Sequence, residues 1–513
     1  MQNLTRRDFL KIGAAGASVG LLRADGSSAS AAAAGPKRGG TFTLARTASI
    51  QDFSGVNLIM GHFAFVRALY NTLVRLDRDL NPQPELAESW QFSPDGRTMT
   101  LKLRGGVKFH SGRDFTAEDV RFSWEFSTDK TTGSPQMREL FSLIKEVQTP
   151  DKSTVELKFD KPNPLVFDAL DTLCMFDRTS VGKLGHTDAG SGPFQVVGYR
   201  PGGDIHLKRF EGYWEADKPS LDEYVIRQIP DSGAMVLNLE SKAVDAIWGV
   251  PLHEVARLGA LPGLTVDPGP PPPNMYQLMV NVRSEPLSHK KVRQAISHAI
   301  DRERICKTIL HGAVKPTWLM WPKGSWAYFE DLEGRYPYNL DRAKALLAEA
   351  GHPNGFETSI NCSQKIMAAQ MGIAQIIQAD LAKIGIRAKI IDLEPTVYVS
   401  RIYKGDFLLT VQNYGRINRD PGTMLGGAVV WYPKGPTGFE SAEFTKWRDE
   451  AATSLDREKR RSLYRNIQEL ALEECFNNPI APQQQFCVYR DYVKGLWFNR
   501  EGVPYVGDLW LDK

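Results

Sequence analysis

The sequence predicts an α/β protein with several domain-sized units. Its 513 residues are enough for about three domains of ordinary size. A hydrophobic content of 42% and a charged content of 24% are typical of a chain that can build a substantial apolar core. Segments in which apolar residues alternate, as in strands, are interspersed with segments of helical spacing, and this mixture favours the α/β class.

The charges are nearly balanced, with 63 basic and 60 acidic residues. The sequence contains no basic run and no basic patch interleaved with aromatic residues, so we expect no nucleic-acid partner. Eleven Trp and sixteen Tyr residues are many for this length, and aromatic rings suit a site that holds small ligands of mixed polarity.

The first 34 residues are predicted to be an export signal. The segment Thr5–Lys11 reads TRRDFLK, a close match to the twin-arginine export motif. A weakly apolar run, Ile12–Leu22, and an Ala/Ser tract ending at Ala34 follow it. The run is too short and too rich in Gly and Ala to span a bilayer. We therefore predict export to a bacterial periplasm by the twin-arginine pathway, with cleavage between Ala31 and Ala34.

The best-defined local pattern is a hairpin followed by a helix, within residues 86–124. The runs Leu86–Phe92 and Arg97–Leu103 carry alternating apolar residues and flank the turn Pro94–Gly96, which predicts a hairpin with one buried face. Thr116 then predicts the start of a helix, because Asp119 three residues later can close a capping box. These are turn and cap devices, and none of them indicates catalysis.

Further elements follow the same two periods. Strands are expected at 39–45, 155–159, 246–248 and 386–393, and helices at 62–73, 232–241, 292–302 and 339–351. The clearest break in composition is at Asp267–Asn274, which contains four consecutive prolines. Such a run favours extended polyproline II, so we interpret it as a semi-rigid connector, with an ordinary surface loop as the alternative.

Residues Leu86–Ser123 closely resemble the signature of the family 5 extracellular solute-binding proteins, the dipeptide, oligopeptide and nickel receptors of ABC importers. Four more segments are similar to motifs of this family: Gly190–Phe194, Arg209–Trp214, Val292–Arg302 and Asn339–Gly351. The resemblance spans essentially the whole chain after the export signal. It implies an α/β, two-lobe periplasmic binding protein fold of the cluster C type, with an extra inserted subdomain in lobe one.

The resemblance also implies where the lobes begin and end. We expect lobe I to comprise 35–78, 190–270 and a C-terminal return at 490–513, the inserted subdomain to comprise 79–189, and lobe II to comprise 271–489. The connector at Asp267–Asn274 then becomes one hinge strand between the lobes.

The function implied is that of a monomeric periplasmic receptor, which captures a small organic solute by closure of two lobes and delivers it to the permease subunits of an ABC importer. The solute is peptide-like or of another kind, with an anionic solute among the alternatives. A secreted enzyme of hydrolase type, a nickel-chelate binding protein, and a chaperone-like or chemoreceptor-docking protein on the same fold are the other readings.

In peptide-binding relatives, a loop of lobe II carries a Trp and an Asp, and this Asp pairs with the α-amino group of the peptide. Here Gly405–Phe407 matches the entrance to the loop and Asp420–Pro421 its exit. Tyr414 can supply the aromatic ring, but no acidic residue lies in the middle of the loop. Arg416 and Arg419 lie there instead, and we expect one of them to bind a carboxylate or phosphate. Ion pairs between the lobes or at the surface are the alternative for both.

The other candidate ligand-binding residues are expected around the same site. Ser49, after the first strand, and Trp248 are the candidates from lobe I, and Tyr276 lies next to the connector. Asn413 and Trp431 are the further candidates from lobe II. For each aromatic side chain, a place in the core is the alternative interpretation.

Motifs for catalysis or metal binding are weak. The GxSxG pattern at Gly16–Gly20 falls within the export signal, and no HxH, HxxH or HExxH pattern pairs two of the nine His residues. We therefore expect no catalytic residue, no metal site and no cofactor. The five Cys residues form no CxxC motif and are expected to be buried free thiols, with Cys475–Cys487 the one pair to test for a disulfide.

Overall fold

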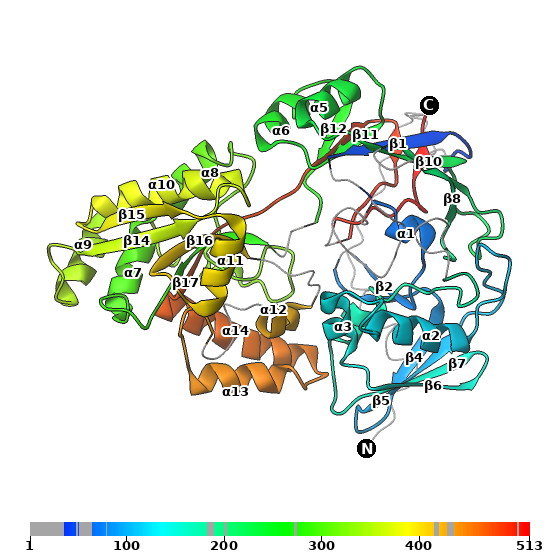
Figure 1. The fold of residues 1–513 in the computed structure, drawn as a ribbon, viewed down its shortest axis with the longest axis horizontal. Helices are drawn as coiled ribbons and strands as arrows, with labels where there is room; N and C mark the ends of the chain where they lie inside the picture. The colour runs from blue at the N-terminus through cyan, green and yellow to red at the C-terminus, as the bar shows by residue number, and fades with distance from the viewer. Residues whose placement is uncertain are drawn as a thin grey trace, which may run out of the picture. The chain divides into compact units, whose positions relative to one another are not determined.

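Two large sheets organise the chain, and a smaller sheet accompanies the first of them (Figure 1). The computed structural model describes residues 35–47, 50, 64–77, 79–181, 189–199, 203–270, 274–414, 420–427, 435–499 and 502–513. Within it, Lys37–Lys513 form one compact unit.

The first sheet has seven strands. In spatial order they are β12 (Leu264–Asp267), β18 (Cys487–Arg490), β11 (Ala246–Trp248), β1 (Thr41–Arg46), β10 (Glu223–Gln228), β9 (Ile205–Arg209) and β8 (Phe194–Tyr199). The central strand β1 runs parallel to both of its neighbours, β10 and β11. One face packs on α5 (Ser232–Glu240) and α6 (Leu252–Gly259), and the other on the larger core that includes α1 (Val66–Leu69) (Figure 1).

The smaller sheet has four antiparallel strands and contains the predicted hairpin. Its order is β4 (Ala87–Phe92), β5 (Thr98–Leu103), β7 (Thr154–Lys158) and β6 (Glu146–Asp151), and α2 (Ala117–Thr128), α3 (Pro135–Phe141) and α4 (Val166–Leu170) accompany it. The hairpin prediction is confirmed, since Trp90 pairs with Leu101 and Phe92 with Met99. The capping box of Thr116 and Asp119 is confirmed as well. Two short pairs complete this half of the chain: β2 (Val74–Leu76) with β3 (Pro82–Pro84), and β19 (Val493–Lys494) with β20 (Trp510–Leu511).

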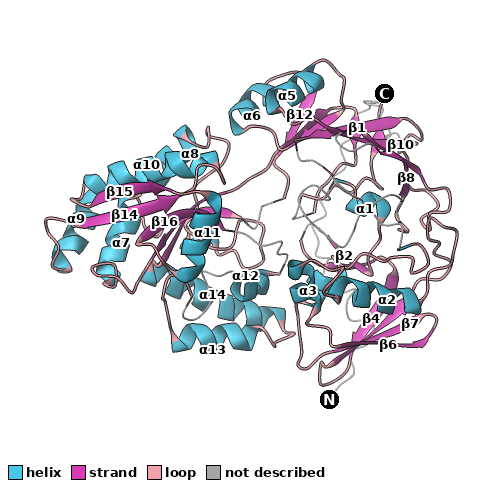
Figure 2. Cartoon of the chain, viewed as in Figure 1, coloured by secondary structure: helices cyan, strands magenta, loops and turns pink. Residues whose placement is uncertain are grey.

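The second large sheet has five strands, in the order β15 (Arg387–Asp392), β14 (Glu357–Cys362), β16 (Leu409–Tyr414), β13 (Met275–Val280) and β17 (Asn477–Pro482). Helices cover both of its faces (Figure 2). One core contains α7 (Lys290–Ala299), α8 (Arg302–Thr308), α9 (Leu340–Glu349) and α10 (Ala368–Ala382). The other contains the 3-10 helix η4 (Glu330–Leu332), α12 (Pro421–Gly427), α13 (Ala442–Ala451) and α14 (Arg457–Glu474), and α11 (Pro395–Lys404) precedes β16.

Strand β13 shows why this sheet is buried on both faces. Tyr276 and Leu278 point into the core with α7–α10, whereas Met275 and Met279 point into the core with α12–α14. This alternation follows from the period of two along a strand. A central strand between two helical layers therefore needs a continuous apolar sequence, and Met275–Val280 has one apart from Gln277.

The chain crosses between the two large sheets twice. It leaves β12 at Asp267 and enters β13 at Met275, and it returns from β17 at Pro482 to β18 at Cys487. The two crossings lie side by side: the amide nitrogen of Gln483 donates to the carbonyl of Asn274 at 2.9 Å. The Nε2 of Gln484 donates to the carbonyl of Pro270 at 3.0 Å. A proline-rich connector and a second, hydrogen-bonded strand thus form a paired connection between the sheets.

All five cysteines are buried free thiols, as expected from the sequence. Cys475 packs in the core around α14, and Cys487 packs in the core of the seven-stranded sheet. Because the two thiols belong to different cores, the pair considered for a disulfide is not bonded.

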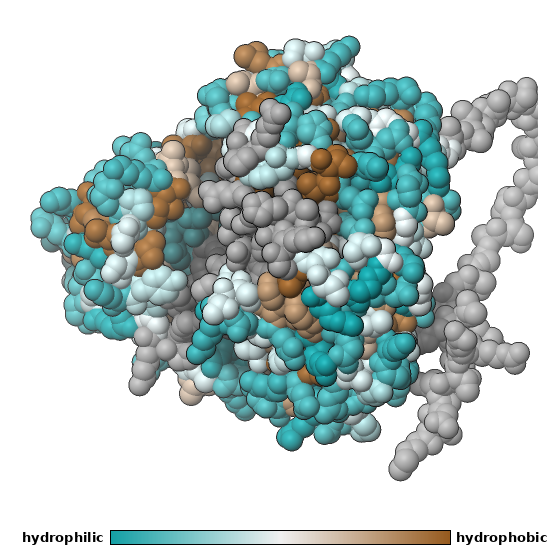
Figure 3. All heavy atoms as spheres, turned by 45° about the vertical axis from the view of Figure 1, so that its right-hand side comes forward, coloured by the Kyte–Doolittle hydropathy of each residue, from teal (hydrophilic) through white to brown (hydrophobic). Residues whose placement is uncertain are grey.

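The face of the molecule in Figure 3 is mostly hydrophilic, with apolar residues in small groups. Among the large apolar side chains exposed on the described surface, Val397, Val399 and Tyr403 all lie on α11. No helix in the described ranges is both long and apolar enough to cross a lipid bilayer. Most large apolar side chains are thus used in the cores.

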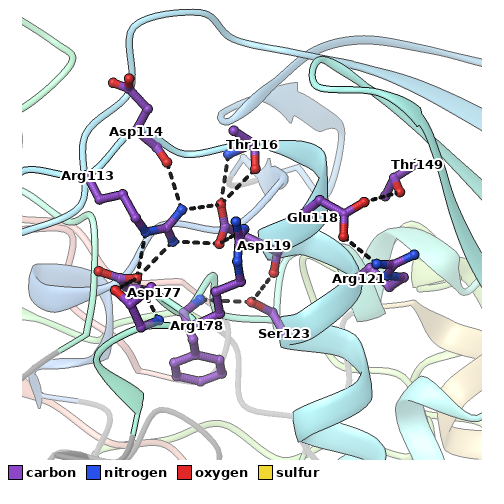
Figure 4. A network of polar contacts seen from close by, with 12 residues as sticks. Arg113, Asp114, Thr116, Glu118, Asp119, Arg121, Ser123, Thr149, Asp177 and Arg178 are labelled. Atoms are coloured by element: carbon purple, nitrogen blue, oxygen red, sulfur yellow. Dashed lines mark hydrogen bonds and ion pairs between the residues drawn. The ribbon is translucent and has the colours of Figure 1, made fainter.

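Arg113 joins the helix α2 to the chain segment around Asp177, as Figure 4 shows. Its guanidinium donates to Asp119 at 2.6 and 3.1 Å and to Asp177 at 2.8 Å. Burial by itself raises the pKa of Asp177, but hydrogen bonds from Ser111, Thr179 and Arg113 outweigh it and lower this pKa from 3.8 to about 2. The carboxylate form of Asp177 is therefore favoured by the fold.

This shift predicts a pH dependence of stability. Because the folded pKa of Asp177 is depressed, its contribution is complete above pH 3.8 and is lost as the pH falls towards 2. We expect Asp177→Asn to flatten the loss of stability over this window, measured as urea midpoints at a series of pH values. Asp217→Asn, at a fully exposed carboxylate, is the control. Equal slopes for Asp177→Asn and the wild type would contradict the prediction.

Candidate functional site

The first half of the candidate site is one edge of the five-stranded sheet. Strands β14, β15 and β16 run parallel, so their carboxyl ends meet at the same edge, which is where open α/β sheets bind ligands. Strand β13 runs antiparallel to β16 and begins at this edge, with Tyr276 opposite Asn413 and Met275 opposite Tyr414. The pairing thus brings together Tyr276 and Asn413, two candidates that are far apart in the sequence.

The side chain of Asn413 is hydrogen bonded on both sides. Its Oδ1 accepts from Nε2 of Gln370 at 3.2 Å, and its Nδ2 donates to Oε1 of Gln483 at 3.2 Å. Gln370 is itself fully buried and accepts from the backbone nitrogen of Ser363 at 2.9 Å. Asn413 therefore holds the end of β16 against α10 and against the second crossing between the sheets. This arrangement makes it a positioning residue.

Tyr276 belongs to the core of the five-stranded sheet. Only 5% of the residue is exposed, and its ring packs with the residues of α7–α10. Burial raises the pKa of Tyr276 to about 12, so the phenol stays protonated at neutral pH. Tyr276 thus supports the site edge from below as a neutral, buried ring.

The second half of the site is the matching edge of the seven-stranded sheet. Strands β1, β10 and β11 are parallel, and Arg46 at the end of β1 pairs with Gln228 on one side and Trp248 on the other. These three residues end adjacent strands at the same edge. The two sheets therefore present the same type of ligand-binding edge, and the paired crossings connect them.

Trp248 is packed between aromatic and backbone groups. Its ring stacks on Phe498 with 4.3 Å between the ring centroids. On Gly502 a Cβ atom would lie 2.5 Å from the Trp248 ring, and on Gly269 it would lie 3.2 Å from it. Both glycines also have positive φ, at +76° and +61°, which other residues rarely adopt. Trp248 thus joins the first crossing to the C-terminal segment, and it is 8% exposed.

Arg46 is a candidate that reasoning from the sequence missed. It is 5% exposed, and burial lowers its pKa to about 10, so its guanidinium is still charged at neutral pH. Arg46 follows Phe42 and Leu44 on the core-facing side of an alternating strand. A charged residue in this register was the available signal, because buried arginines are uncommon away from partners or ligands.

The remaining candidates cannot be placed from the described residues. Ser49, Arg416, Arg419 and Trp431 lie outside them, as does the side chain of Tyr414. Within the described part of the chain, no three His, Cys, Asp or Glu side chains come together in a way that could hold a metal ion.

The model of bacterial extracellular solute-binding proteins, family 5, matches residues 81–433. The chain belongs to this family. The resemblance noted in the sequence is therefore confirmed. Among the curated family relatives, heme-binding protein A from Haemophilus influenzae is 29% identical over 493 residues, which cover 89% of each chain.

Solved structures related to this family 5 protein support the same fold. The structure of HbpA2 from Haemophilus parasuis has a TM-score of 0.86 and 26% identity, and it covers 92% of this chain and 100% of its own. The ABC transporter-associated periplasmic binding protein DppA from Helicobacter pylori, solved with the peptide STSA, has a TM-score of 0.74 and 28% identity over 93% and 99% of the two chains. The predicted two-lobe periplasmic binding protein fold is confirmed.

In this family 5 fold, the seven-stranded sheet forms lobe I, the four-stranded sheet its additional subdomain, and the five-stranded sheet lobe II. The second crossing ends at Cys487, close to the return to lobe I predicted at residue 490.

Proposed function

We propose that this family 5 protein is the periplasmic receptor of an ABC importer, which captures a small organic solute between its lobes and delivers it to the membrane permease without transforming it. The observation that carries the proposal is the pair of parallel-strand carboxyl edges, one from each large sheet, joined by two adjacent crossings. Two binding edges on a hinged connection suit capture by closure.

Closure sets the energy that the solute must supply. A solute shifts an equilibrium between open and closed lobes only through its preference for the closed state, and a shift from 1:99 to 99:1 needs about 5.5 kcal/mol of such preference. Groups from both lobes must therefore contact the solute. Arg46 in lobe I and the lobe II loop that begins after Asn413 are the groups that the fold brings to the two edges.

An anionic group on the solute is part of the proposal. The loop sequence between Asn413 and Asp420 has two arginines and no carboxylate in its middle, and Arg46 adds a buried positive charge on lobe I. A buried amine left without a counter-ion costs several kcal/mol, which disfavours capture of an ordinary peptide through its amino group. A carboxylate or phosphate would instead be stabilised by guanidinium groups.

The export route and oligomeric state belong to the same proposal. The twin-arginine motif at Thr5–Lys11 supports export of the folded chain to the periplasm, and a monomer is sufficient for capture between two lobes of one chain.

Mass spectrometry of small molecules that co-purify with the native protein tests the function. We expect one organic solute at near-stoichiometric amount, and we expect the isolated solute at 100 times its Kd to stabilise the protein by about 2.7 kcal/mol in a thermal shift assay. Conversion of that solute into a product by the pure protein would contradict the proposal.

Calorimetry with the isolated solute tests the arginines. We expect the Arg416→Ala, Arg419→Ala double variant to bind at least tenfold more weakly, since one lost charged hydrogen bond is worth about 1.5–3 kcal/mol. Arg387→Ala, at an exposed arginine of β15, is the matched control. Unchanged affinity of the double variant would show that neither arginine contacts the solute.

A further inference from the structure

One direct hydrogen bond joins the additional subdomain of lobe I to lobe II. The backbone nitrogen of Asp420, which immediately precedes α12, donates to Oδ2 of Asp168 on α4 at 2.8 Å. Asp168 is 5% exposed, so its carboxylate lies at a contact that excludes most water. Asp420 is also the exit residue of the lobe II loop that the sequence identifies as the ligand loop.

Lobe II holds Asp420 firmly in place. The carboxylate of Asp420 accepts two hydrogen bonds from the guanidinium of Arg460, one of them at 2.9 Å, and a third from the backbone nitrogen of Gly422 at 2.7 Å. Arg460 is buried, donates to the hydroxyl of Tyr464 at 2.7 Å, and lies over the ring of Trp326 at 5.2 Å. The backbone nitrogen of Asp420 is therefore presented to lobe I in a fixed direction.

Other contacts surround this hydrogen bond. Nη1 of Arg457 donates to Oδ1 of Asn81 at 3.0 Å, and a Cβ atom on Gly96 would lie 3.3 Å from Leu455. A cavity of about 280 Å³ lies beside them, lined from lobe I by residues that include Phe167 and Asp168 and from lobe II by residues that include Trp326 and Arg460. The contact is thus partly open, and only a few groups carry it.

We propose that Asp168 is the lobe I acceptor of an inter-lobe latch, formed by Asp168, Asp420 and Arg460, which stabilises the closed state and ties closure to the end of the ligand loop. The latch rests on the proposed function, because it acts only if capture proceeds by closure. A carboxylate that accepts a backbone N–H forms a charge-assisted bond, which is stronger than a bond between neutral groups and strongly directional. When the lobes separate, Asp168 loses this donor and the N–H of Asp420 becomes accessible to water.

Hydrogen exchange of the Asp420 amide tests the latch without any ligand. We expect Asp168→Ala to speed exchange in the peptide that contains Asp420 on the order of tenfold, the factor that corresponds to a charged hydrogen bond of modest strength. Small-angle X-ray scattering should show a larger radius of gyration for the same variant. Asp160→Asn, at an exposed carboxylate of the same subdomain that pairs with Lys145 at 3.3 Å, should leave both measurements unchanged.

A second variant keeps the test decisive if Asp168→Ala does not fold. Asp168→Asn keeps the shape and an acceptor oxygen but removes the charge, so we expect a smaller acceleration of exchange in the same peptide. Wild-type exchange at Asp420 in either folded variant would overturn the latch. Acceleration spread evenly over all peptides would also overturn it, because that pattern reports general destabilisation. A failure here leaves the proposed function intact, since that depends on the co-purifying solute.

Discussion

Replacing Arg67 by Met is expected to lower the free energy of unfolding by about 3–5 kcal/mol, because the change leaves two buried carboxylates without their cation. The side chains of Arg67, Glu85 and Asp171 are 5%, 7% and 0% exposed. The guanidinium donates to Oε2 of Glu85 at 3.2 Å and also to the carboxylate of Asp171. Glu85 is further fixed by the backbone nitrogen of Thr72 at 3.0 Å.

Urea denaturation of the purified variants measures this loss. Arg121→Met is the matched control, since Arg121 forms an exposed pair with Glu118 on α2 and such pairs contribute about 0–1 kcal/mol. The triple variant Arg67→Met, Glu85→Gln, Asp171→Asn should recover part of the lost stability, because it removes the uncompensated charges. A single variant as stable as the wild type would show that water or other groups compensate the two carboxylates.

Trp248→Ala is expected to cost about 3–5 kcal/mol of stability, the usual range for removal of a large buried aromatic ring. The ring fills the space between Phe498, Gly269 and Gly502, so its loss leaves a cavity and loosens the join between the first crossing and the C-terminal segment. Thermal and urea denaturation measure the effect, and Trp248→Phe should retain most of the stability.

The same variants decide between two roles of Trp248. Sequence reasoning placed Trp248 among the ligand-binding residues, with a place in the core as the alternative. If Trp248→Ala keeps its stability within about 1 kcal/mol but weakens binding of the co-purified solute, the ring is a ligand platform. Loss of stability together with unchanged affinity in Trp248→Phe assigns it to the scaffold.

Local sequence patterns predicted the elements well where the physical cause is local. The turn Pro94–Gly96 and the cap at Thr116 depend on residues at most a few positions apart, and both form as expected. The cap at Asn339 also forms, accepting from the backbone nitrogen of Arg342 at 2.9 Å. By contrast, the segment after Gly106, expected as the strand 107–110, makes only an isolated bridge between Lys108 and Asp114. Its residues lack a neighbouring strand with which to pair.

The candidate site was predicted less completely, because its geometry depends on contacts between distant segments. Tyr276 and Asn413 meet through the pairing of β13 with β16, which their separate sequences do not specify. The hydrogen bonds that occupy Asn413 come from Gln370 and Gln483, on two further segments. Arg46 was passed over because a strand pattern does not tell which end of a sheet becomes a binding edge.

The sequence by itself determined the family, the α/β class and the position of the proline-rich connector, because these follow from residues that are neighbours along the chain. Only the tertiary structure decided that Trp248 and Asn413 are held by other side chains, that Arg46 ends the central strand at the lobe I edge, and that Asp420 meets Asp168. Burial and hydrogen bonding join groups far apart in sequence, and their energies depend on where the fold places them.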